Sequence, residues 1–429
     1  MAPHSDLIDQ ARSLATSWRT ELDLSRLIRE QLERCEVLDP PGPIDVVAIG
    51  KAAGEMASAT LSILGARVAR TLVICDDEGS SCAPSSAEVV VGEHPLPGDA
   101  SLRAGVRLLG FLASSTSPGT VFLVSGGASS LCVAPAAPLT IEDLHAIFRA
   151  ALESGADITT LNRLRASTSL LGGGAVLARR RGDVSVSLIM VDNVVSGPEW
   201  VASGLTYDFR PSSLEVRQLV EAVGLTGGEL AERIVFASEQ RGRLIGQHRP
   251  ARHLNRVVAD PAMMLASVER EATARGYQVY ALGSAVHDDV QEATQRWSDA
   301  IAALGSLARP TCVVGVGEVT VRVRGRGTGG RCQQFALSMA EPLAELDVDD
   351  DAVFVASSSD GRDYVEGVAG AWVDSSTTRV AEEYGIDLGR ALDDNDAFDA
   401  LGALGQLIDG AHTGWNLCDV YLALLSPRS

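Results

Sequence analysis

Residues 44–64 read IDVVAIGKAAGEMASATLSIL, and they determine the predicted fold of the first half of the chain. The run IDVVAIG is short, apolar and rich in β-branched residues, which is typical of a buried strand. The residues after it carry apolar side chains at a spacing of three to four, which is typical of a helix. A strand that leads directly into a helix predicts one βα unit of a parallel sheet, with Gly50 and Lys51 at the junction.

The same alternation continues beyond this unit. Further strands are predicted at TLVIC (71–75), EVVVG (88–92), VFLVSGG (121–127) and VSLIMVDN (186–193). Helices are predicted at 99–115, with Asp99 as the candidate N-cap, and at 141–156. Nearly continuous apolar strands alternating with helices indicate a mostly parallel sheet that is covered on both faces.

A second α/β half is predicted after residues 241–256, RGRLIGQHRPARHLNR, which are polar and basic and are typical of an inter-domain connection. A chain of 429 residues also exceeds what one core usually serves. We therefore expect an N-terminal domain over 1–245 and a C-terminal domain over 246–429. The second domain has predicted strands at 278–284, 311–325, 352–361 and 420–425, and predicted helices at 268–276 and 331–346.

Composition excludes several classes of partner. The net charge of −20 and the pI near 4.8 argue against a nucleic-acid or anionic-membrane surface, because such partners are held by broad basic patches. The N-terminus lacks the pattern of a signal peptide, and no apolar run is long enough to cross a bilayer, so a cytoplasmic location is expected. The seven cysteines are scattered and are expected to be reduced.

Lys51 is the single lysine among the 36 lysine and arginine residues. One interpretation is codon bias, which replaces lysine by arginine wherever either is tolerated. The other is chemical: an ammonium is a compact point charge and a guanidinium is a broad planar group, so a site that binds through a point charge would not accept arginine in place of lysine. The surrounding sequence is not a Walker A loop, because Ala52 stands where Ser or Thr is required.

The turn after the predicted strand at 121–124 contains Ser125, Gly126, Gly127 and Ser129. Backbone N–H groups at such a helix start form a natural anion site, and glycines let a phosphate approach closely. A tight βα turn without a ligand is an equal alternative. Asp192 follows another strand, where a carboxylate can hold Mg²⁺, orient a hydroxyl or simply cap a helix.

Residues 317–339, GEVTVRVRGRGTGGRCQQFALSM, give the strongest local signal. They contain Glu318, an apparent alternating strand, and a glycine loop that includes Gly327, Gly329 and Gly330 before Arg331. The loop satisfies G-x-G-x-x-G, but no strand-end acid lies about twenty residues further on, so dinucleotide binding is disfavoured. An arginine behind a glycine loop suits a phosphate better.

Polar residues also follow other predicted strands and loops of the second half. They are Asp360 in SSSDG, Asn395 in DDND, and Thr413 and Asn416 in HTGWN. Each alone is an ordinary turn signal. Their number in one half of the chain favours a functional interpretation.

In its order of motifs, the sequence resembles the class II glycerate 2-kinases, the MOFRL-domain family. The segments that carry the resemblance are IGKAAGEMA, GEHPLPGDASLRAG, VSGGASSL, VASGLT, GEVTVRVRGRGTGGRCQQFAL, SSDG, DNDA and HTGWNLCDV. They occur in the family's order from about residue 45 to residue 425. The likeness therefore covers most of the chain.

The resemblance implies a two-domain α/β protein, with a Rossmann-like N-terminal domain and an active site in the interdomain cleft. It implies transfer of the γ-phosphoryl group of ATP, with Mg²⁺, to a hydroxyl of a small hydroxy acid. Lys51 and Arg331 match the family's essential cations. The implied nucleotide or phosphate site comprises Ser125, Gly126, Gly127, Ser129, Gly327, Gly329 and Gly330. The implied substrate site comprises Asp192, Ser203, Glu318, Asp360, Asn395, Thr413 and Asn416, with Asp192 also the candidate metal ligand.

The sequence departs from the family pattern in two motifs. The segment VDNVVSGP retains Asp192 but has Ser196 and Gly197 where the family carries acids, and Gln334 replaces a family Glu. Trp200 and Trp415 stand where smaller residues are usual, and indoles offer a large stacking surface. These changes favour a larger acceptor, such as a polyol, a sugar or a specialised metabolite. A non-catalytic phosphate-binding homologue is the alternative, and the oligomeric state, a homodimer included, stays open.

Overall fold

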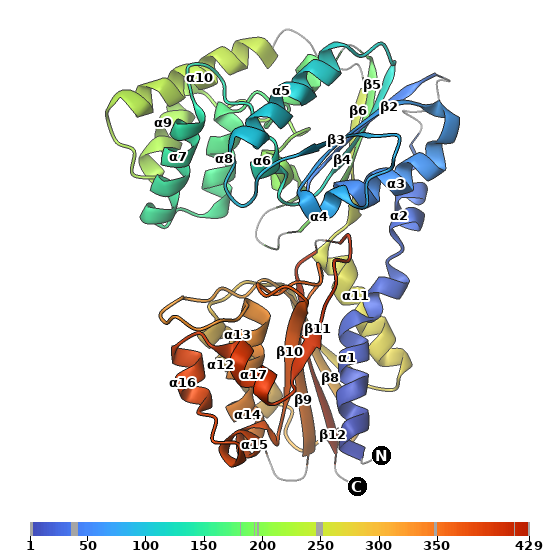
Figure 1. Ribbon diagram of the computed structural model, residues 1–429, viewed down its shortest axis with the longest axis vertical. Coiled ribbons are helices and arrows are strands. Elements are labelled where there is room, and N and C mark those ends of the chain that lie inside the picture. The colour runs from blue at the N-terminus through green and yellow to red at the C-terminus, as the bar shows by residue number, and fades with distance from the viewer. Residues whose placement is uncertain are drawn as a thin grey trace. The chain divides into compact units, whose positions relative to one another are not determined.

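The structure, a computed structural model, describes residues 3–35, 42–180, 182–192, 194, 197–245, 252–346, 350–415 and 417–427. The chain divides into two compact units (Figure 1). The N-terminal unit comprises residues 24–192 and 196–258, and the C-terminal unit comprises residues 1–23, 193–195 and 259–429. These units do not coincide with the expected ranges 1–245 and 246–429, because residues up to 258 fall in the N-terminal unit and the first helix falls in the C-terminal unit.

The N-terminal unit contains a six-stranded sheet in the order β3-β2-β1-β4-β5-β6. Its strands are β1 (Ile44–Ile49), β2 (Val68–Cys75), β3 (Glu88–Val91), β4 (Gly119–Val124), β5 (Val184–Met190) and β6 (Arg252–Ala259). The pairings among the first five strands are parallel, and Ile49 lies level with Val124 of β4. Every residue of β1 and β4 is buried. The predicted parallel sheet with two covered faces is confirmed.

Helices cover this sheet and form an adjoining cluster. The helices are α2 (Leu24–Glu33), α3 (Ala53–Leu64), α4 (Asp77–Ser80), α5 (Asp99–Ala113), α6 (Ala128–Leu131), α7 (Ile141–Ser154), α8 (Ile158–Thr168), α9 (Ser213–Ala222) and α10 (Glu229–Ile245). Short 3₁₀ turns are η2 (Gly65–Arg67), η3 (Ala175–Arg179) and η4 (Pro198–Ser203). Helices α7 to α10 share a separate apolar core beside the sheet (Figure 1).

The C-terminal unit contains a second six-stranded sheet in the order β11-β10-β9-β12-β8-β7. Its strands are β7 (Gln278–Val286), β8 (Thr311–Gly317), β9 (Asp350–Ser358), β10 (Val368–Asp374), β11 (Leu407–Asp409) and β12 (Asp419–Pro427). Only the β7–β8 pair is parallel, and the other pairs are antiparallel. The unit is therefore α/β, as predicted, with a mixed sheet.

Helices lie on both faces of the second sheet (Figure 1). Helices α1 (Pro3–Glu21) and α11 (Pro261–Ala274) pack together on one face. The other face carries α12 (Val290–Ala302), α13 (Arg331–Ser338), α14 (Ala340–Ala344), α15 (Thr377–Glu383), α16 (Leu388–Asp393) and α17 (Ala397–Ala403). Buried Trp297, Phe335, Phe354 and Tyr421 meet edge to face at the centre of that side.

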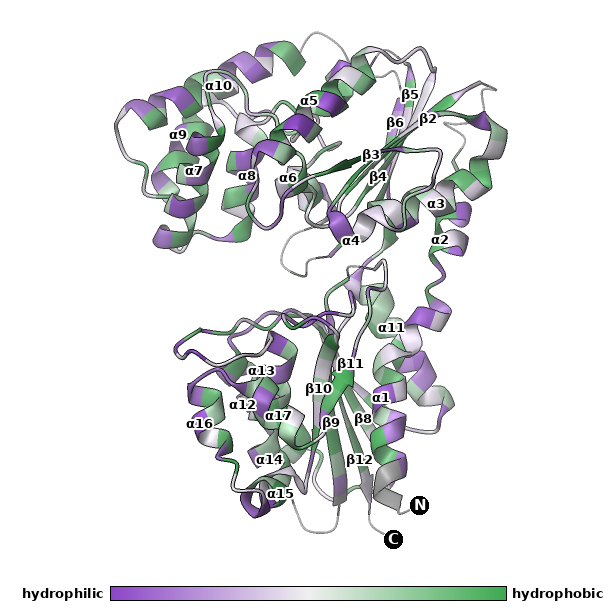
Figure 2. Ribbon diagram, viewed as in Figure 1, coloured by the Kyte–Doolittle hydropathy of each residue, from purple (hydrophilic) through white to green (hydrophobic). Residues whose placement is uncertain are grey.

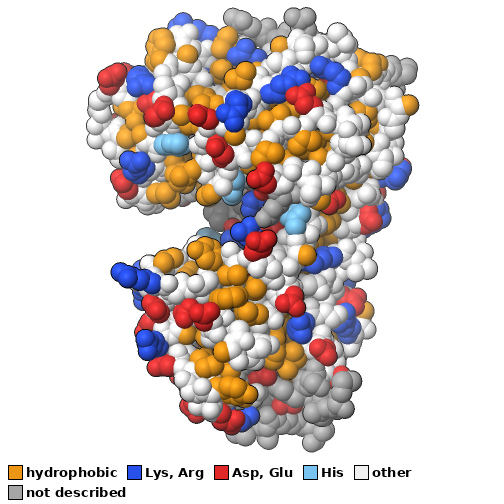
Figure 3. Space-filling view, viewed as in Figure 1, with side chains coloured by type: hydrophobic (Ala, Val, Ile, Leu, Met, Phe, Trp, Pro, Cys, Tyr) orange, Lys and Arg blue, Asp and Glu red, His pale blue; other side chains and the backbone are white. Residues whose placement is uncertain are grey.

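Hydropathy follows this layering. Figure 2 shows apolar residues along the strands and polar residues on the outward parts of the helices. Among the described residues, no helix combines the length and the apolar character that a membrane span needs. Figure 3 shows acidic and basic side chains interspersed on one face of the molecule. All seven cysteines are free thiols, as predicted.

Three local predictions are wrong. Residues 318–325 do not continue β8, which ends at Gly317; Val323 is 82% exposed, and Thr320 forms an isolated bridge with Asp289 instead of a continuous ladder. Part of the segment interpreted as a connection is β6, whose polar residues are tolerated because it lies at a sheet edge. Asp99 is the first residue of α5 rather than its N-cap, and Glu93 accepts a hydrogen bond from the N–H of Ala100 at 3.2 Å.

Candidate functional site

Two adjacent βα turns of the N-terminal unit interlock around Lys51. The backbone N–H of Lys51 donates to the carbonyl of Gly126 at 2.9 Å, and the N–H of Ala52 donates to Ser125 Oγ at 3.1 Å. Gly50 has φ +127°, and a Cβ there would lie 2.3 Å from Ser125 Oγ. Only glycine fits this close approach. The turn after β1 and the turn after β4 therefore form one rigid unit.

The Lys51 side chain lies against Gly127 and His94. A Cβ at Gly127 would be 3.2 Å from Lys51 Cγ and 3.4 Å from His94 Cδ2, so the missing side chain leaves room for both. Burial and the charge of Lys51 lower the pKa of His94. The imidazole beside the ammonium is therefore neutral at physiological pH, which leaves the positive charge concentrated on Lys51.

Two carboxylates lie at the same edge of this sheet. Asp76 follows β2, and its Oδ1 accepts a hydrogen bond from the N–H of Gly79 at 2.8 Å. Asp192 follows β5 and is half-buried. Since β1, β2, β4 and β5 are parallel neighbours, their carboxyl ends meet at one edge. The structure thus brings Asp192 to the edge that carries Lys51 and Ser125.

Ser129 and Ser203 come together in the same unit, although they are far apart in sequence. Their hydroxyl oxygens are 2.8 Å apart, and Ser203 Oγ also lies 3.4 Å from Asn162 Oδ1. Ala202 and Ser203 have φ of +54° and +52°, in the left-handed region that residues other than glycine rarely occupy. Strain of this kind gathers at functional sites.

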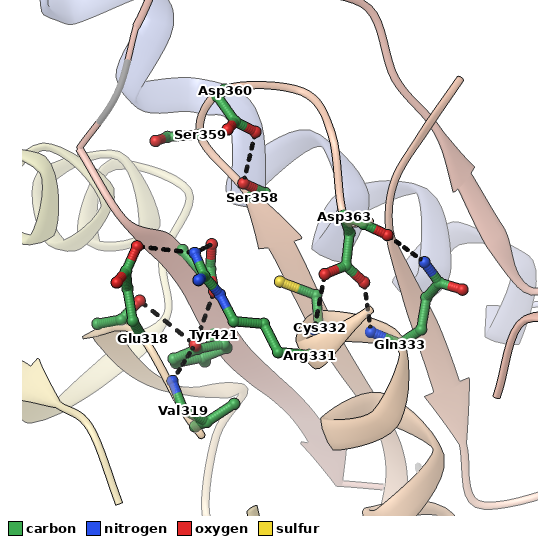
Figure 4. A network of polar contacts seen from close by, with 12 residues as sticks. Glu318, Val319, Arg331, Cys332, Gln333, Ser358, Ser359, Asp360, Asp363 and Tyr421 are labelled. Carbon is green, nitrogen blue, oxygen red and sulfur yellow. Dashed lines mark hydrogen bonds and ion pairs between the residues drawn. The ribbon is translucent and has the colours of Figure 1, made fainter. Parts of the chain in front are cut away.

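In the C-terminal unit, Arg331 is held by two acids. Its Nε donates to Asp419 Oδ2 at 2.6 Å, and its Nη2 donates to Glu318 Oε1 at 2.8 Å. Figure 4 shows the guanidinium turned toward Glu318 and Tyr421. Burial disfavours the charged guanidinium, but Asp419 and then Glu318 outweigh it and raise the pKa of Arg331. Arg331 therefore stays a cation at every accessible pH.

Three residues of this network were missed by sequence reasoning. Asp419 is fully buried at the start of β12, and Tyr421 donates to its Oδ2 at 3.0 Å while accepting from the N–H of Val319. Asp363 accepts from the N–H groups of Cys332 and Gln333 and so caps α13. Asp419 stood in the quoted HTGWNLCDV segment as the polar residue that opens an apolar strand, and that position was the available signal.

The glycine loop before Arg331 is braced from within the unit. Asn395 Oδ1 accepts from the N–H groups of Arg324 and Gly325, and the carbonyl of Asp394 accepts from the N–H of Gly327 at 2.8 Å. Gly329 and Gly330 lie at the end of the loop, where a Cβ on Gly330 would be 2.2 Å from Asp363. Several amides of the loop are thus already paired, and Asn395 holds the loop in shape.

Asp360 and Thr413 adjoin each other near the end of β9. The N–H of Thr413 donates to the carbonyl of Asp360 at 3.2 Å, and Ser358 Oγ donates to Asp360 Oδ1 at 2.8 Å. Asn416 lies outside the described residues. Trp415 packs edge to face on Trp18 at 5.6 Å. Trp200, in the other unit, packs on Phe209 at 5.3 Å, so each indole has a structural partner.

The predicted site residues therefore fall into two groups. The N-terminal unit gathers Lys51, Ser125, Gly126, Gly127, Ser129, Asp192 and Ser203 around the carboxyl ends of its strands. The C-terminal unit gathers Glu318 with Arg331, the loop glycines with Asn395, and Asp360 with Thr413. Each unit offers one cation embedded in a fixed polar frame, which is suited to charge stabilisation during group transfer.

Comparison with known proteins agrees with this architecture. Residues 12–235 match a domain of unknown function, DUF4147, and residues 311–419 match the MOFRL family. The D-glycerate 2-kinase of Thermotoga maritima is 26% identical over 389 residues, covering 89% of this chain and 90% of that enzyme. The glycerate 2-kinase of Pyrococcus horikoshii is 26% identical over 434 residues, covering 98% and 96%.

The fold is also that of a solved structure. A crystal structure of the Thermotoga maritima glycerate kinase superposes with a TM-score of 0.83 at 24% identity, covering 98% of this chain and 99% of the other. Fold, cations and sequence matches together define the class as a phosphotransferase with an alcohol group as acceptor. Within that class, the chain belongs to the MOFRL-domain family of class II glycerate 2-kinases.

Proposed function

We propose that this protein is an ATP-dependent kinase that phosphorylates a hydroxyl of a small hydroxy acid of the glycerate type. The acceptor oxygen attacks the γ-phosphorus, the bond to the ADP oxygen breaks, and the hydroxyl proton is released. Such a reaction depends chiefly on positioning and on fixed positive charge at the transferred group. The single observation that carries the proposal is Lys51, held by two interlocked glycine turns in a chain that matches glycerate kinases along most of its length.

In this proposal Lys51 stabilises negative charge on the transferred phosphoryl group. The neighbouring Ser125, Gly126 and Gly127 turn supplies backbone that a phosphate can approach closely. Gly127 is essential to this arrangement, because a Cβ would crowd the stem of the lysine. A broad guanidinium would meet the same turn, which gives a physical reason for the retained lysine.

Arg331 is the proposed cation of the C-terminal unit. Asp419 is completely buried, whereas the side chain of Glu318 is 40% exposed. The buried partner fixes the orientation of the guanidinium, and the exposed partner can be exchanged for a phosphate oxygen at low cost. Gly327, Gly329 and Gly330 stay candidate phosphate contacts, as Asp360, Asn395, Thr413 and Asn416 stay candidate substrate contacts.

The proposed metal is Mg²⁺ bound together with ATP. Within the described ranges, no group of three or more His, Cys, Asp or Glu side chains could form a metal cage. Mg²⁺ in kinases is usually bound by one or two carboxylates and the nucleotide phosphates, so a cage is not required. Asp192, at the strand edge beside the Lys51 turn, fits that role. When bound, the ion would neutralise phosphate charge.

The proposal is tested by coupled measurement of ADP release with ATP, Mg²⁺ and a panel of hydroxy acids, polyols and sugars. We expect at least one hydroxy acid to raise turnover well above the rate with ATP alone. The alternative, a non-catalytic phosphate-binding homologue, predicts that ATP protects the protein against thermal unfolding while no acceptor increases ADP. Failure of ATP both to bind and to turn over would exclude the kinase.

A further inference from the structure

A pocket lies inside the N-terminal unit, between α6, α7, α8 and η4, with an empty volume of about 760 Å³ that includes its open mouth. Its walls are mostly apolar, with Ile49, Leu144, Ile147, Phe148, Leu161 and Leu205 among them. A pocket with mostly apolar walls and a few polar groups is typical of a small-molecule site.

One cation lines this pocket. Arg165, on α8, places its guanidinium 5.2 Å from the centre of the Phe148 ring. Within the part of the chain that the structure describes, no carboxylate or hydrogen-bond acceptor pairs with it. Burial lowers the pKa of Arg165 to about 10, so it is still charged at neutral pH. Arg165 is half-buried, and a cation in that position without a carboxylate partner can attract a ligand anion.

The pocket has few other polar groups to offer. Thr168 Oγ1 donates to the carbonyl of Leu164, and Ser169 Oγ accepts from the N–H groups of Leu171 and Gly172. The Thr168 hydroxyl proton is therefore used within its own helix, whereas Ser169 still has its hydroxyl proton to donate. Ser129 and Ser203 also line the pocket and are bonded to each other. When Ser203 donates to Asn162, Ser129 donates to Ser203 and keeps lone pairs that can accept from a ligand hydroxyl.

This pocket adjoins the Lys51 turn. Ser129 stands two residues after Gly127, where an added Cβ would lie 3.2 Å from Lys51 Cγ and 3.4 Å from His94 Cδ2. The charges of Lys51 and Arg165 both reach His94. A ligand held by Arg165 and Ser129 therefore lies in the same neighbourhood as the cation that we assign to phosphoryl transfer.

We propose that this pocket is the acceptor site, and that Arg165 binds the carboxylate of a hydroxy acid that carries an apolar substituent. The proposal rests on the kinase function proposed above and names its substrate class. Ser129 and Ser203 orient the acceptor hydroxyl, and the aliphatic and Phe148 walls enclose the substituent. A guanidinium suits this role because it binds a carboxylate through two parallel hydrogen bonds.

The same walls argue against a polyol or a sugar. Each additional hydroxyl of such a ligand would leave water and face Ile147, Leu161 or Leu205 without a partner. Trp200 and Trp415 also pack on aromatic residues of the protein itself, so a stacked sugar ring is not needed to explain either indole. An apolar hydroxy acid fits the pocket best.

Calorimetric titration without nucleotide tests this assignment, with glycerate and 2-hydroxyisocaproate as the two probes. We expect the wild type to bind 2-hydroxyisocaproate about tenfold more tightly than glycerate, because the branched substituent is buried. Arg165→Gln should weaken both acids by about 30-fold or more. Arg163→Gln is the matched control, since Arg163 is on the same helix but pairs with Glu215 and stacks on Phe209.

A thermal measurement separates binding from folding. Arg165→Gln should leave the melting temperature of the ligand-free protein nearly unchanged, because the side chain is half-buried and the substitution breaks no ion pair. A folded Arg165→Gln variant that binds both acids like the wild type would overturn the assignment. So would a wild type that prefers glycerate or binds neither acid.

Turnover distinguishes this proposal from the kinase proposal on which it rests. If both acids bind through Arg165 but neither acid increases the release of ADP, the assignment of the pocket is supported and the kinase function is contradicted. If glycerate is phosphorylated and Arg165→Gln does not change its KM, the kinase stands and the pocket assignment fails.

Discussion

Lys51 lies beside two glycines, Gly50 and Gly127, which have no side chains. At Gly50 the turn after β1 can therefore contact the turn after β4, and Gly127 leaves room for the lysine stem. The backbone of Lys51 is tied to Gly126, and its charge lowers the pKa of His94. This position therefore combines a fixed backbone with a local positive charge, which the proposed chemistry requires.

Lys51→Arg is the residue-scale test of that chemistry. The variant keeps the charge but not its shape, so we expect kcat to fall by about 10²-fold or more while the melting temperature changes little. Arg103→Lys, a conservative exchange at an exposed position of α5, should leave both unchanged. Steady-state kinetics and circular dichroism measure the two effects. A fully active Lys51→Arg enzyme would indicate that codon bias, and not a chemical requirement, explains the single lysine.

At the scale of the element, α13 depends on a cap that comes from a distant loop. Asp363 accepts from the N–H groups of Cys332 and Gln333, and a carboxylate at a helix N-terminus is favoured by the helix dipole. Figure 4 shows Asp363 turned toward both residues. The cap places Arg331 at the first position of the helix, next to Glu318 and Asp419.

The pH dependence of stability should reveal the burial of Asp363 beside Asp419. Burial, and then the charge of Asp419, raise the pKa of Asp363 to about 6, above the value of about 3.9 in an unfolded chain. The folded state thus binds this proton more tightly, so its stabilising effect is complete below pH 4 and is lost as pH rises through 6.

The measurement compares wild type with Asp363→Asn by urea unfolding between pH 4 and pH 6.5. The free energy of unfolding of the wild type should fall relative to the variant as pH rises, by about 2 to 3 kcal/mol at most. Parallel pH profiles for the two proteins would contradict a raised pKa at Asp363.

Sequence reasoning succeeded where local pattern decides the structure. The buried strands β1 and β4 and the helix α3 follow from apolar spacing, and strand ends in a parallel sheet share one edge. It failed where partners are distant in sequence. Nothing local tells that Asp363 caps α13, that residues 394–396 brace the glycine loop, or that Arg165 on α8 has a pocket beside it rather than solvent. The Val and Arg alternation after Gly317 has the period of a strand but forms only an isolated bridge, at Thr320, among the described residues.

At the scale of the whole molecule, the first helix belongs to the unit that completes the chain. Leu14 is fully buried, Trp18 is 1% exposed, and α1 packs on α11 and against β9 and β12. Trp18 also meets Trp415 edge to face. Helix α1 is therefore part of the C-terminal core, although in sequence the N-terminal unit lies between α1 and the rest of that core.

Trp18→Ala should destabilise one unit only. We expect a loss of about 3 to 5 kcal/mol from the C-terminal unit, because a large buried side chain is replaced by a cavity. Differential scanning calorimetry should show one transition shifted to lower temperature and the other unchanged. Ser17→Ala is a matched control beside it, since the Ser17 hydroxyl donates to the carbonyl of Leu14 in the same helix at 2.8 Å. A uniform shift of both transitions would show that α1 stabilises the N-terminal unit as well.

This placement of α1 has a consequence for synthesis on the ribosome. The segment from 24 to 258 can fold as soon as it leaves the ribosome. Helix α1 can pack only after β9 and β12 have been synthesised, and β12 ends at residue 427. Until then its buried stripe is exposed and open to chaperones or to a neighbouring nascent chain. Placing α1 after β12 by circular permutation should shorten this delay and increase the yield of folded protein.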